Sequence, residues 1–92
     1  MRIRRSHELG LEEAKSRIDH VAETLGTEYS LTSSWNGDHV LVRGSGVNGR
    51  IDVSPQHVEA EIRLGIPLML FHHQIRSRIE EVMDEHFGQS GA

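Results

Sequence analysis

Histidines are the side chains of this 92-residue chain best suited to binding a metal ion or transferring a proton at neutral pH. The seven histidines stand at His7, His20, His39, His57, His72, His73 and His86. No His-Glu-x-x-His sequence occurs. His72 and His73 are adjacent, so a helix would point them in different directions, whereas His39 and His57 could meet across a sheet. Because histidine ligands normally come with supporting partners, we interpret all seven as surface residues and predict no metal site and no cofactor.

Two groups of acidic residues could take part in acid–base catalysis. Asp84-Glu85-His86 brings carboxylates next to an imidazole, but adjacent helical side chains do not face each other. Glu59 and Glu61 share one face of an expected strand, where Arg50 and Arg63 are the expected cross-strand partners. We interpret the first group as a charged last helical turn and the second as a charge-paired, solvated face. No catalytic residue is predicted.

Two segments could bind an anion. Gly44-Ser45-Gly46 could offer backbone amides to a negative charge, but it has neither the helix nor the Lys-Ser/Thr pair of a phosphate-binding loop. It also lacks the G-x-S-x-G sequence of a serine nucleophile, so we interpret it as a glycine-rich turn. Arg2, Arg4 and Arg5 could contact an acidic partner or a phosphate. The charged residues of a protected edge strand explain these arginines equally well.

A run of eight residues without a polar side chain, from Leu64 to Phe71, is the most unusual feature of the chain. It stands where an expected strand gives way to an expected helix. One helical stripe cannot bury all the side chains of residues 68–71, so some must be covered by another element or a second subunit, or else stay exposed. Packing of this junction in the core is the first interpretation. The alternative is an oligomer interface or contact with a hydrophobic surface. The candidate contact surface consists of Ile66, Leu68, Met69, Leu70 and Phe71.

The spacing of apolar residues predicts the elements that position these groups. Steps of three and four predict a helix over residues 11–29, with Gly26 as an alternative end. A second helix is expected to begin near Leu68 and to run to Phe87, followed by a frayed tail at 89–92. Alternation of apolar and polar residues predicts strands, which fall at 2–6, 31–35, 39–43, 47–53 and 57–64.

The order of these elements, β-α-β-β-β-β-α, predicts an α+β fold in one domain spanning residues 1–92. Each helix has one apolar face, and the strands alternate, so one face of the sheet is buried and the other is solvated. We therefore predict a two-layer sandwich, with an antiparallel sheet of three to five strands and both helices packed on one face. The first strand could pair at an edge of this sheet or with a neighbouring subunit.

The composition excludes several classes of protein. There is no cysteine, hence no disulfide framework and no thiolate metal site. The formal net charge of −4 disfavours a nucleic-acid partner. No apolar stretch is long enough for a transmembrane segment, and none follows the N-terminal arginines as in a signal peptide. We expect a cytoplasmic protein.

The chain resembles the polyhydroxyalkanoic acid system family of small bacterial proteins, also called the granule-region family. The segments that carry the resemblance are, in order, Arg2-Ile3-Arg4-Arg5-Ser6-His7, Leu11-Glu12-Glu13-Ala14, Trp35-Asn36-Gly37-Asp38, Gly46-Val47-Asn48-Gly49-Arg50-Ile51-Asp52-Val53, Arg63-Leu64-Gly65 and Ile75-Arg76-Ser77-Arg78-Ile79-Glu80. The glycines at 37 and 49 suit positive φ angles or close backbone approach. The resemblance implies a link to the storage polyester poly(3-hydroxyalkanoate), with association with storage granules or their regulation, and it transfers no catalytic or ligand residue.

Two hypotheses of function follow. The first is a non-enzymatic protein of the polyhydroxyalkanoate system that contacts a granule surface, a granule protein or a second copy of itself through the candidate contact surface. The second is a small-ligand-binding or weakly catalytic domain with a pocket between the sheet and the helices. Trp35, Tyr29 and Phe71 would line that pocket, with His39 or His57 as its polar group.

Overall fold

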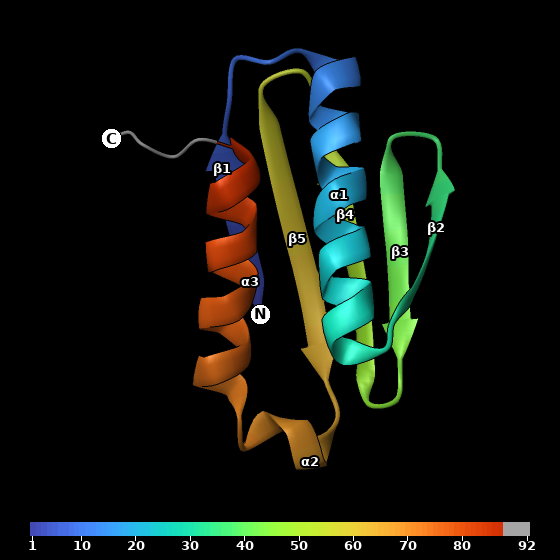
Figure 1. Ribbon diagram of the computed structural model, residues 1–92, viewed down its shortest axis with the longest axis vertical. Helices are drawn as coiled ribbons and strands as arrows, with labels where there is room; N and C mark the ends of the chain where they lie inside the picture. Colours follow the sequence, from blue (N-terminus) through green and yellow to red (C-terminus); the bar gives the residue numbers. More distant parts are fainter. Residues whose placement is uncertain (88–92) are drawn as a thin grey trace.

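The computed structural model describes residues 1–87, and the tail predicted at 89–92 lies outside them. Its elements, in chain order, are β1 (Arg2–Ser6), α1 (Leu11–Tyr29), β2 (Thr32–Asn36), β3 (His39–Gly44), β4 (Val47–Val53), β5 (His57–Leu64), α2 (Ile66–Met69) and α3 (His72–Phe87). The strands form one antiparallel sheet in the order β1-β5-β4-β3-β2 (Figure 1). The predicted α+β class and element order are confirmed, with the short helix α2 as an addition.

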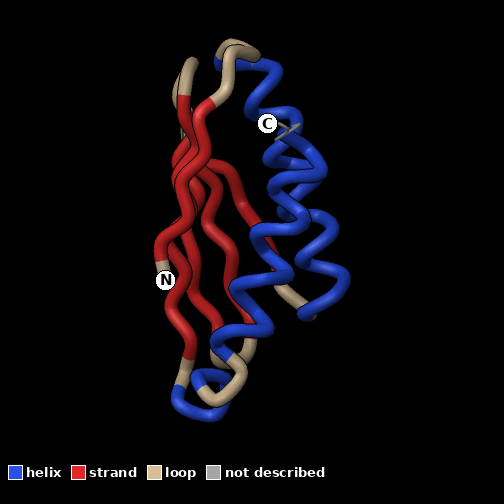
Figure 2. The backbone as a smooth tube through the Cα atoms, turned by 90° about the vertical axis from the view of Figure 1, so that its left-hand side faces the viewer, coloured by secondary structure: helices blue, strands red, loops and turns tan. Residues whose placement is uncertain are grey.

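The sheet forms one layer, and α1 and α3 form the other on a single sheet face (Figure 2). The core between the layers is aliphatic apart from Phe87 and Met83. Its largest fully buried side chains are Ile3, Ile18, Val21, Val40, Val58, Val82 and Met83. Alternation along the strands explains this arrangement, because every second side chain of β5 turns toward the helices and the others turn toward solvent.

Strand β1 pairs within its own chain, along the outer edge of β5. Ile3 lies opposite Ala60, and both are buried. On the solvated face, Arg2 lies opposite Glu61 and Arg4 opposite Glu59. The pairing that the sequence left open is thus fixed by one buried apolar pair and two cross-strand pairs of opposite charge.

Helix α1 passes through Gly26 and ends at Tyr29, the later of the two ends that the sequence allowed. Ser30 takes a left-handed conformation with φ 58°, and the Leu31 N–H donates to the Gly26 carbonyl at 2.9 Å. This bond satisfies one of the last carbonyl groups of the helix and turns the chain toward β2.

Two glycines have different structural roles. Gly37 lies in the turn between β2 and β3 with φ +64°, as the Asn-Gly sequence predicted. Gly49 lies inside β4 and faces the core between Val42 and Ile62. A Cβ at this position would lie 2.6 Å from Ile62 Cδ1 and 2.7 Å from Val42 Cγ2. Gly49 therefore allows close packing of its neighbours and forms no turn.

The second helix does not begin near Leu68, as the spacing predicted, but is divided in two. Gly65 and Pro67 start the four-residue helix α2, because proline suits the first turn of a helix. The chain then passes through Leu70 and Phe71 before α3 begins at His72. This division carries the chain from the end of β5 across to the helical layer, and it leaves α2 below the sandwich (Figures 1 and 2).

Candidate contact surface and apolar pocket

Four large apolar side chains are exposed where α2 leads into α3. Ile66 is 81% exposed, Met69 58%, Leu70 83% and Phe71 52%. We call these four residues the apolar tip. They lie at the end of the molecule where β5 finishes, below the sandwich (Figure 1). Four of the five residues of the predicted candidate contact surface are therefore exposed to solvent.

Leu68, the fifth predicted residue, is mostly buried and points back toward the core. Its Cδ1 would lie 3.1 Å from a Cβ at Gly46, so the absence of a side chain there leaves room for it. The Gly65 N–H donates to the Gly46 carbonyl at 2.8 Å. Leu68 and this hydrogen bond attach α2 to the turn between β3 and β4, while the apolar tip faces outward.

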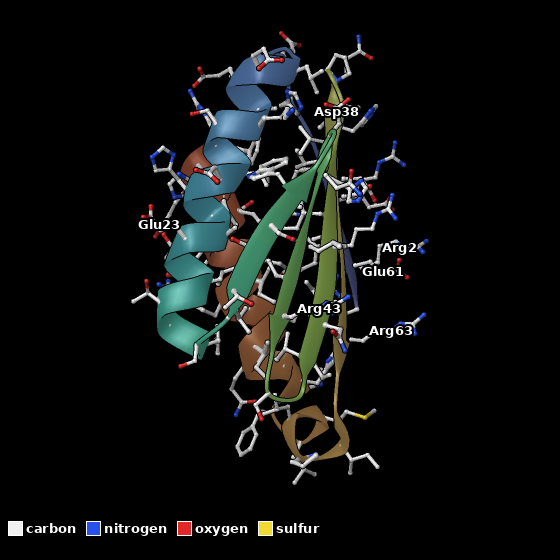
Figure 3. The ribbon with its side chains drawn as sticks, turned by 90° about the vertical axis from the view of Figure 1, so that its right-hand side faces the viewer. Arg2, Glu23, Asp38, Arg43, Glu61 and Arg63 are labelled. Carbon is white, nitrogen blue, oxygen red and sulfur yellow. The ribbon has the colours of Figure 1, made fainter. Side chains whose placement is uncertain are left out.

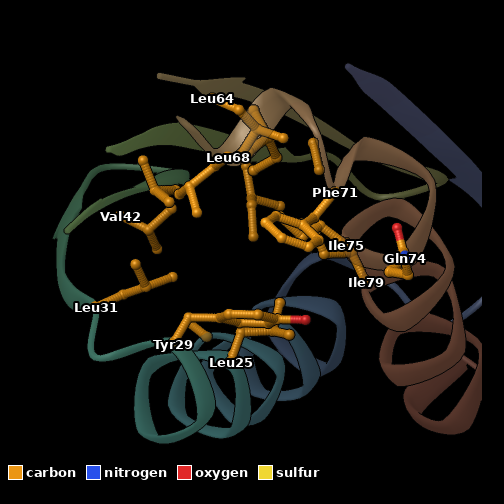
Figure 4. Close-up of a pocket in the computed structure, with 15 residues that line it drawn as sticks. Leu25, Tyr29, Leu31, Val42, Leu64, Leu68, Phe71, Gln74, Ile75 and Ile79 are labelled. Atoms are coloured by element: carbon orange, nitrogen blue, oxygen red, sulfur yellow. The ribbon is translucent and has the colours of Figure 1, made fainter. Parts of the chain in front are cut away.

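A pocket of about 290 Å³ lies between the sheet and the helices at the same end of the molecule (Figure 4). Its walls include Ala22, Leu25 and Tyr29 of α1, and Ile75 and Ile79 of α3. Its floor is formed by inward-facing aliphatic side chains of three strands, namely Val42, Val47, Ile51, Ala60, Ile62 and Leu64.

The pocket opens beside the apolar tip. Phe71 and Gln74 are the exposed members of its lining, and Leu31 and Leu68 complete the rim. Phe71 thus belongs to both features. Among the lining residues, the only polar side-chain groups are the Tyr29 hydroxyl and the Gln74 amide, and no charged side chain of residues 1–87 lines the pocket.

An ion pair joins α1 to α3 next to this pocket. Arg78 Nε donates to both carboxylate oxygens of Glu28, at 3.0 and 2.9 Å, and its Nη1 donates to Glu81 at 3.0 Å. The hydrogen bond from Arg78 lowers the pKa of the Glu28 carboxyl. Burial, followed by the charge of Glu28, raises the pKa of the Tyr29 phenol. The phenol is therefore neutral at physiological pH, and its hydroxyl lies next to the Glu28 carboxylate.

The predicted pocket exists, but only part of its predicted lining is correct. Tyr29 and Phe71 line it, whereas Trp35 does not, because its Nε1 donates to Asp19 at 3.0 Å on the surface of α1. His39 and His57 are absent from the lining, and strand β4 separates the strands that carry them. The pocket therefore has no convergent polar groups for catalysis.

His7, predicted to lie on the surface, is instead buried, with 9% exposure. Its Nε2 lies 3.0 Å from the Ser54 carbonyl, and its Nδ1 accepts from the Leu9 N–H at 3.1 Å. Because a carbonyl can only accept, the proton lies on Nε2. The sequence could not indicate this burial, because both hydrogen-bond partners of His7 are main-chain groups, which every residue carries. His7 therefore joins the β1–α1 connection to the end of β4.

The other candidate groups are dispersed. Asp84 binds Arg5 at 2.7 Å, and the ring of His86 stacks on that of His20 at 5.9 Å between centroids, so Asp84-Glu85-His86 forms no catalytic pair. Ser45 is exposed in the turn between β3 and β4. Across residues 1–87, no three histidine, aspartate or glutamate side chains gather as a metal site would require.

The solvated sheet face is charge-paired, as predicted, although only one of the two predicted arginines lies opposite a glutamate. Arg2 reaches both Glu59, at 3.6 Å, and Glu61, at 3.3 Å. Arg50 lies opposite Glu61 across the strands, as predicted, while its Nε binds Asp52 at 2.9 Å. Arg63 lies opposite Asn48 instead of a glutamate. The arginines of this face point away from the helices (Figure 3). Since Arg5 turns to α3, the N-terminal arginines do not form one anion site.

The helices of the described chain are too short or too polar to cross a membrane. Searches of the curated proteins and of the solved structures gave no significant match. The sequence model of the family described as "Putative polyhydroxyalkanoic acid system protein" matches residues 1–87. The match covers every element from β1 to α3. The chain therefore belongs to the polyhydroxyalkanoic acid system protein family.

Proposed function

We propose that this protein is a non-enzymatic member of the polyhydroxyalkanoate system that attaches to storage granules in the cytoplasm through its apolar tip. The exposure of Ile66, Met69, Leu70 and Phe71 carries the proposal. Contiguous apolar side chains are costly to leave in water, and such patches commonly mark contact sites. The polyester itself, or an apolar patch on a granule protein, would cover them.

The rest of the molecule supports attachment through this end. The solvated sheet face carries arginine–carboxylate pairs, which suit contact with water. Hydrogen bonds and ion pairs occupy the side chains that catalysis could have used, among them His7 and Asp84. The α2 segment, which leads into the rest of the apolar tip, lies beyond the end of both layers (Figure 2), so the tip can touch a surface without any change in the sandwich.

The experiment compares binding of purified protein to poly(3-hydroxyalkanoate) particles by sedimentation. Ile66→Ser combined with Leu70→Ser removes two of the most exposed apolar side chains. Full burial of each is worth about 1.5–3 kcal/mol, so we expect the affinity for the particles to fall at least about tenfold. Leu41→Ser, on the solvated sheet face, is the matched control and should bind like the wild type.

Self-association through the apolar tip is the competing outcome, and light scattering of both proteins in solution distinguishes it. The tip would be assigned to a homodimer if the wild type is dimeric, the double variant is monomeric, and both bind the particles equally well. Equal particle binding by both proteins, with both monomeric, would exclude the tip as a contact site.

A further inference from the structure

We infer that the pocket between the sheet and the helices binds a linear alkyl chain with an uncharged polar end. This inference concerns the interior of the molecule and does not depend on attachment through the apolar tip. The volume of about 290 Å³ is roughly twice that of an engineered apolar cavity that stays dry and binds benzene. A buried water needs two to four polar partners, and the aliphatic floor of this pocket offers none, so an apolar ligand is the suitable occupant.

The shape of the pocket selects a chain. Its lining on α1 extends from Ala22 to Tyr29, which corresponds to about 10 Å of helix. A methylene group has a contact radius of about 2 Å, so the pocket admits an alkyl chain that lies along this length. Figure 4 looks along the helices and shows the lining side chains arranged around this hollow.

The groups at the rim select the end of the ligand. The Gln74 amide can donate and accept a hydrogen bond, whereas the Tyr29 hydroxyl lies next to the Glu28 carboxylate and interacts with it. A carboxylate would find no free cation there, because Arg78 already binds Glu28 and Glu81. A hydroxyl or an ester carbonyl therefore matches the opening better than an ionised acid does.

A side chain from a second copy of the protein is a poorer occupant. Leucine and phenylalanine side chains extend only about 4–5 Å from the backbone, so one of them would leave more than half of a pocket about 10 Å long empty. The apolar tip also faces away from the pocket, except for Phe71. The occupant that fills the whole length is a free alkyl chain.

The probes are 1-hexanol, 1-octanol and 1-decanol, with binding followed through the methyl NMR signals of Ala22 and Ile75. Each methylene that enters the pocket should raise the affinity about fourfold. An extended chain advances about 1.3 Å per carbon, so the gain should stop at about eight carbons. Decanoate should bind more weakly than 1-decanol. An absence of saturable binding by every alcohol would overturn the inference, and tighter binding of decanoate would overturn the uncharged end.

Ala22→Leu fills part of the pocket from α1 and should weaken 1-octanol binding at least tenfold. Ile75→Phe fills part of the pocket from α3, and it replaces Ala22→Leu in the experiment if that variant does not fold. The control is Ile66→Ser with Leu70→Ser, which changes the apolar tip but not the pocket lining. Loss of octanol binding in this control, with binding retained in the filled variants, would place the alcohol on the tip and refute the pocket. Polyester particles test the tip separately, so either idea can fail alone.

Discussion

Leu68 and Leu70 are two positions apart on the same short segment, and their substitution by alanine should have very different effects on stability. Leu70 is 83% exposed, so folding buries only about a sixth of its side chain. At about 1.5–3 kcal/mol for complete burial, Leu70→Ala should lower the free energy of unfolding by less than about 0.5 kcal/mol. Leu68 is mostly buried beside Gly46. Leu68→Ala should therefore cost about 1–2 kcal/mol, with little additional cavity cost because the pocket next to it is already open.

Urea unfolding followed by circular dichroism measures both free energies. The two substitutions remove the same atoms, so each variant is the control for the other. The slope of the free energy against urea should stay unchanged in both. Equal losses at Leu68 and Leu70 would refute the division between an anchoring side chain and an exposed apolar tip.

Three further substitutions test other parts of the structure. Gly49→Val should destabilise the fold by about 1–3 kcal/mol in urea unfolding, because its side chain would enter the packed core, whereas Asn48→Val on the solvated face should be nearly neutral. His7→Ala should cost about 1–3 kcal/mol in the same assay, since two buried backbone groups lose their partner; an unchanged midpoint would contradict that role. Arg78 lowers the pKa of Glu28 below its ordinary value of 4.5 in the folded state, so the pair stabilises the fold above that pH and ceases to do so as the pH falls through the lowered pKa. The stability advantage of the wild type over Glu28→Gln should accordingly be present at pH 7 and vanish in acid, and an advantage that persists at low pH would exclude the ion pair as its cause.

Much of the fold follows from periodicity. The stripe of α1 and the alternation of β5 each identify the buried face directly, and Asn36-Gly37 identifies a hairpin turn. The division between α2 and α3 did not follow, because the four consecutive apolar residues 68–71 show no period that would distinguish a helix from a connecting segment. The chain must cross from the end of β5 to the helical layer, and this distance decides where the helix is interrupted. A local sequence pattern carries no information about that distance.

The candidate site was predictable in part for a related reason. A run of eight apolar residues exceeds what one helical face can bury, so the sequence marked residues 66–71 as a candidate contact surface without deciding whether they are buried in the core, covered by a second subunit or exposed. A pocket between the layers could be proposed from the sequence, but its lining residues could not. The lining depends on which small side chains of the sheet and the helices lie opposite one another. Ala22 on α1 and Ala60 on β5 leave the space that larger residues would fill, and their meeting is a property of the packed layers alone.

Phe71 decides how the two apolar features can be separated. It is half exposed as part of the apolar tip, and it also lines the opening of the pocket. A substitution at Phe71 would therefore change both particle attachment and alkyl-chain binding. Loss of both would not show which of the two sites had been affected. Ile66 and Leu70 belong to the tip alone, and Ala22 belongs to the pocket alone. Because Ile66 and Leu70 do not line the pocket and Ala22 is not part of the tip, substitutions at the two sites should have independent effects on binding. A particle-binding defect in Ala22→Leu would mean that the pocket and the tip act as one site.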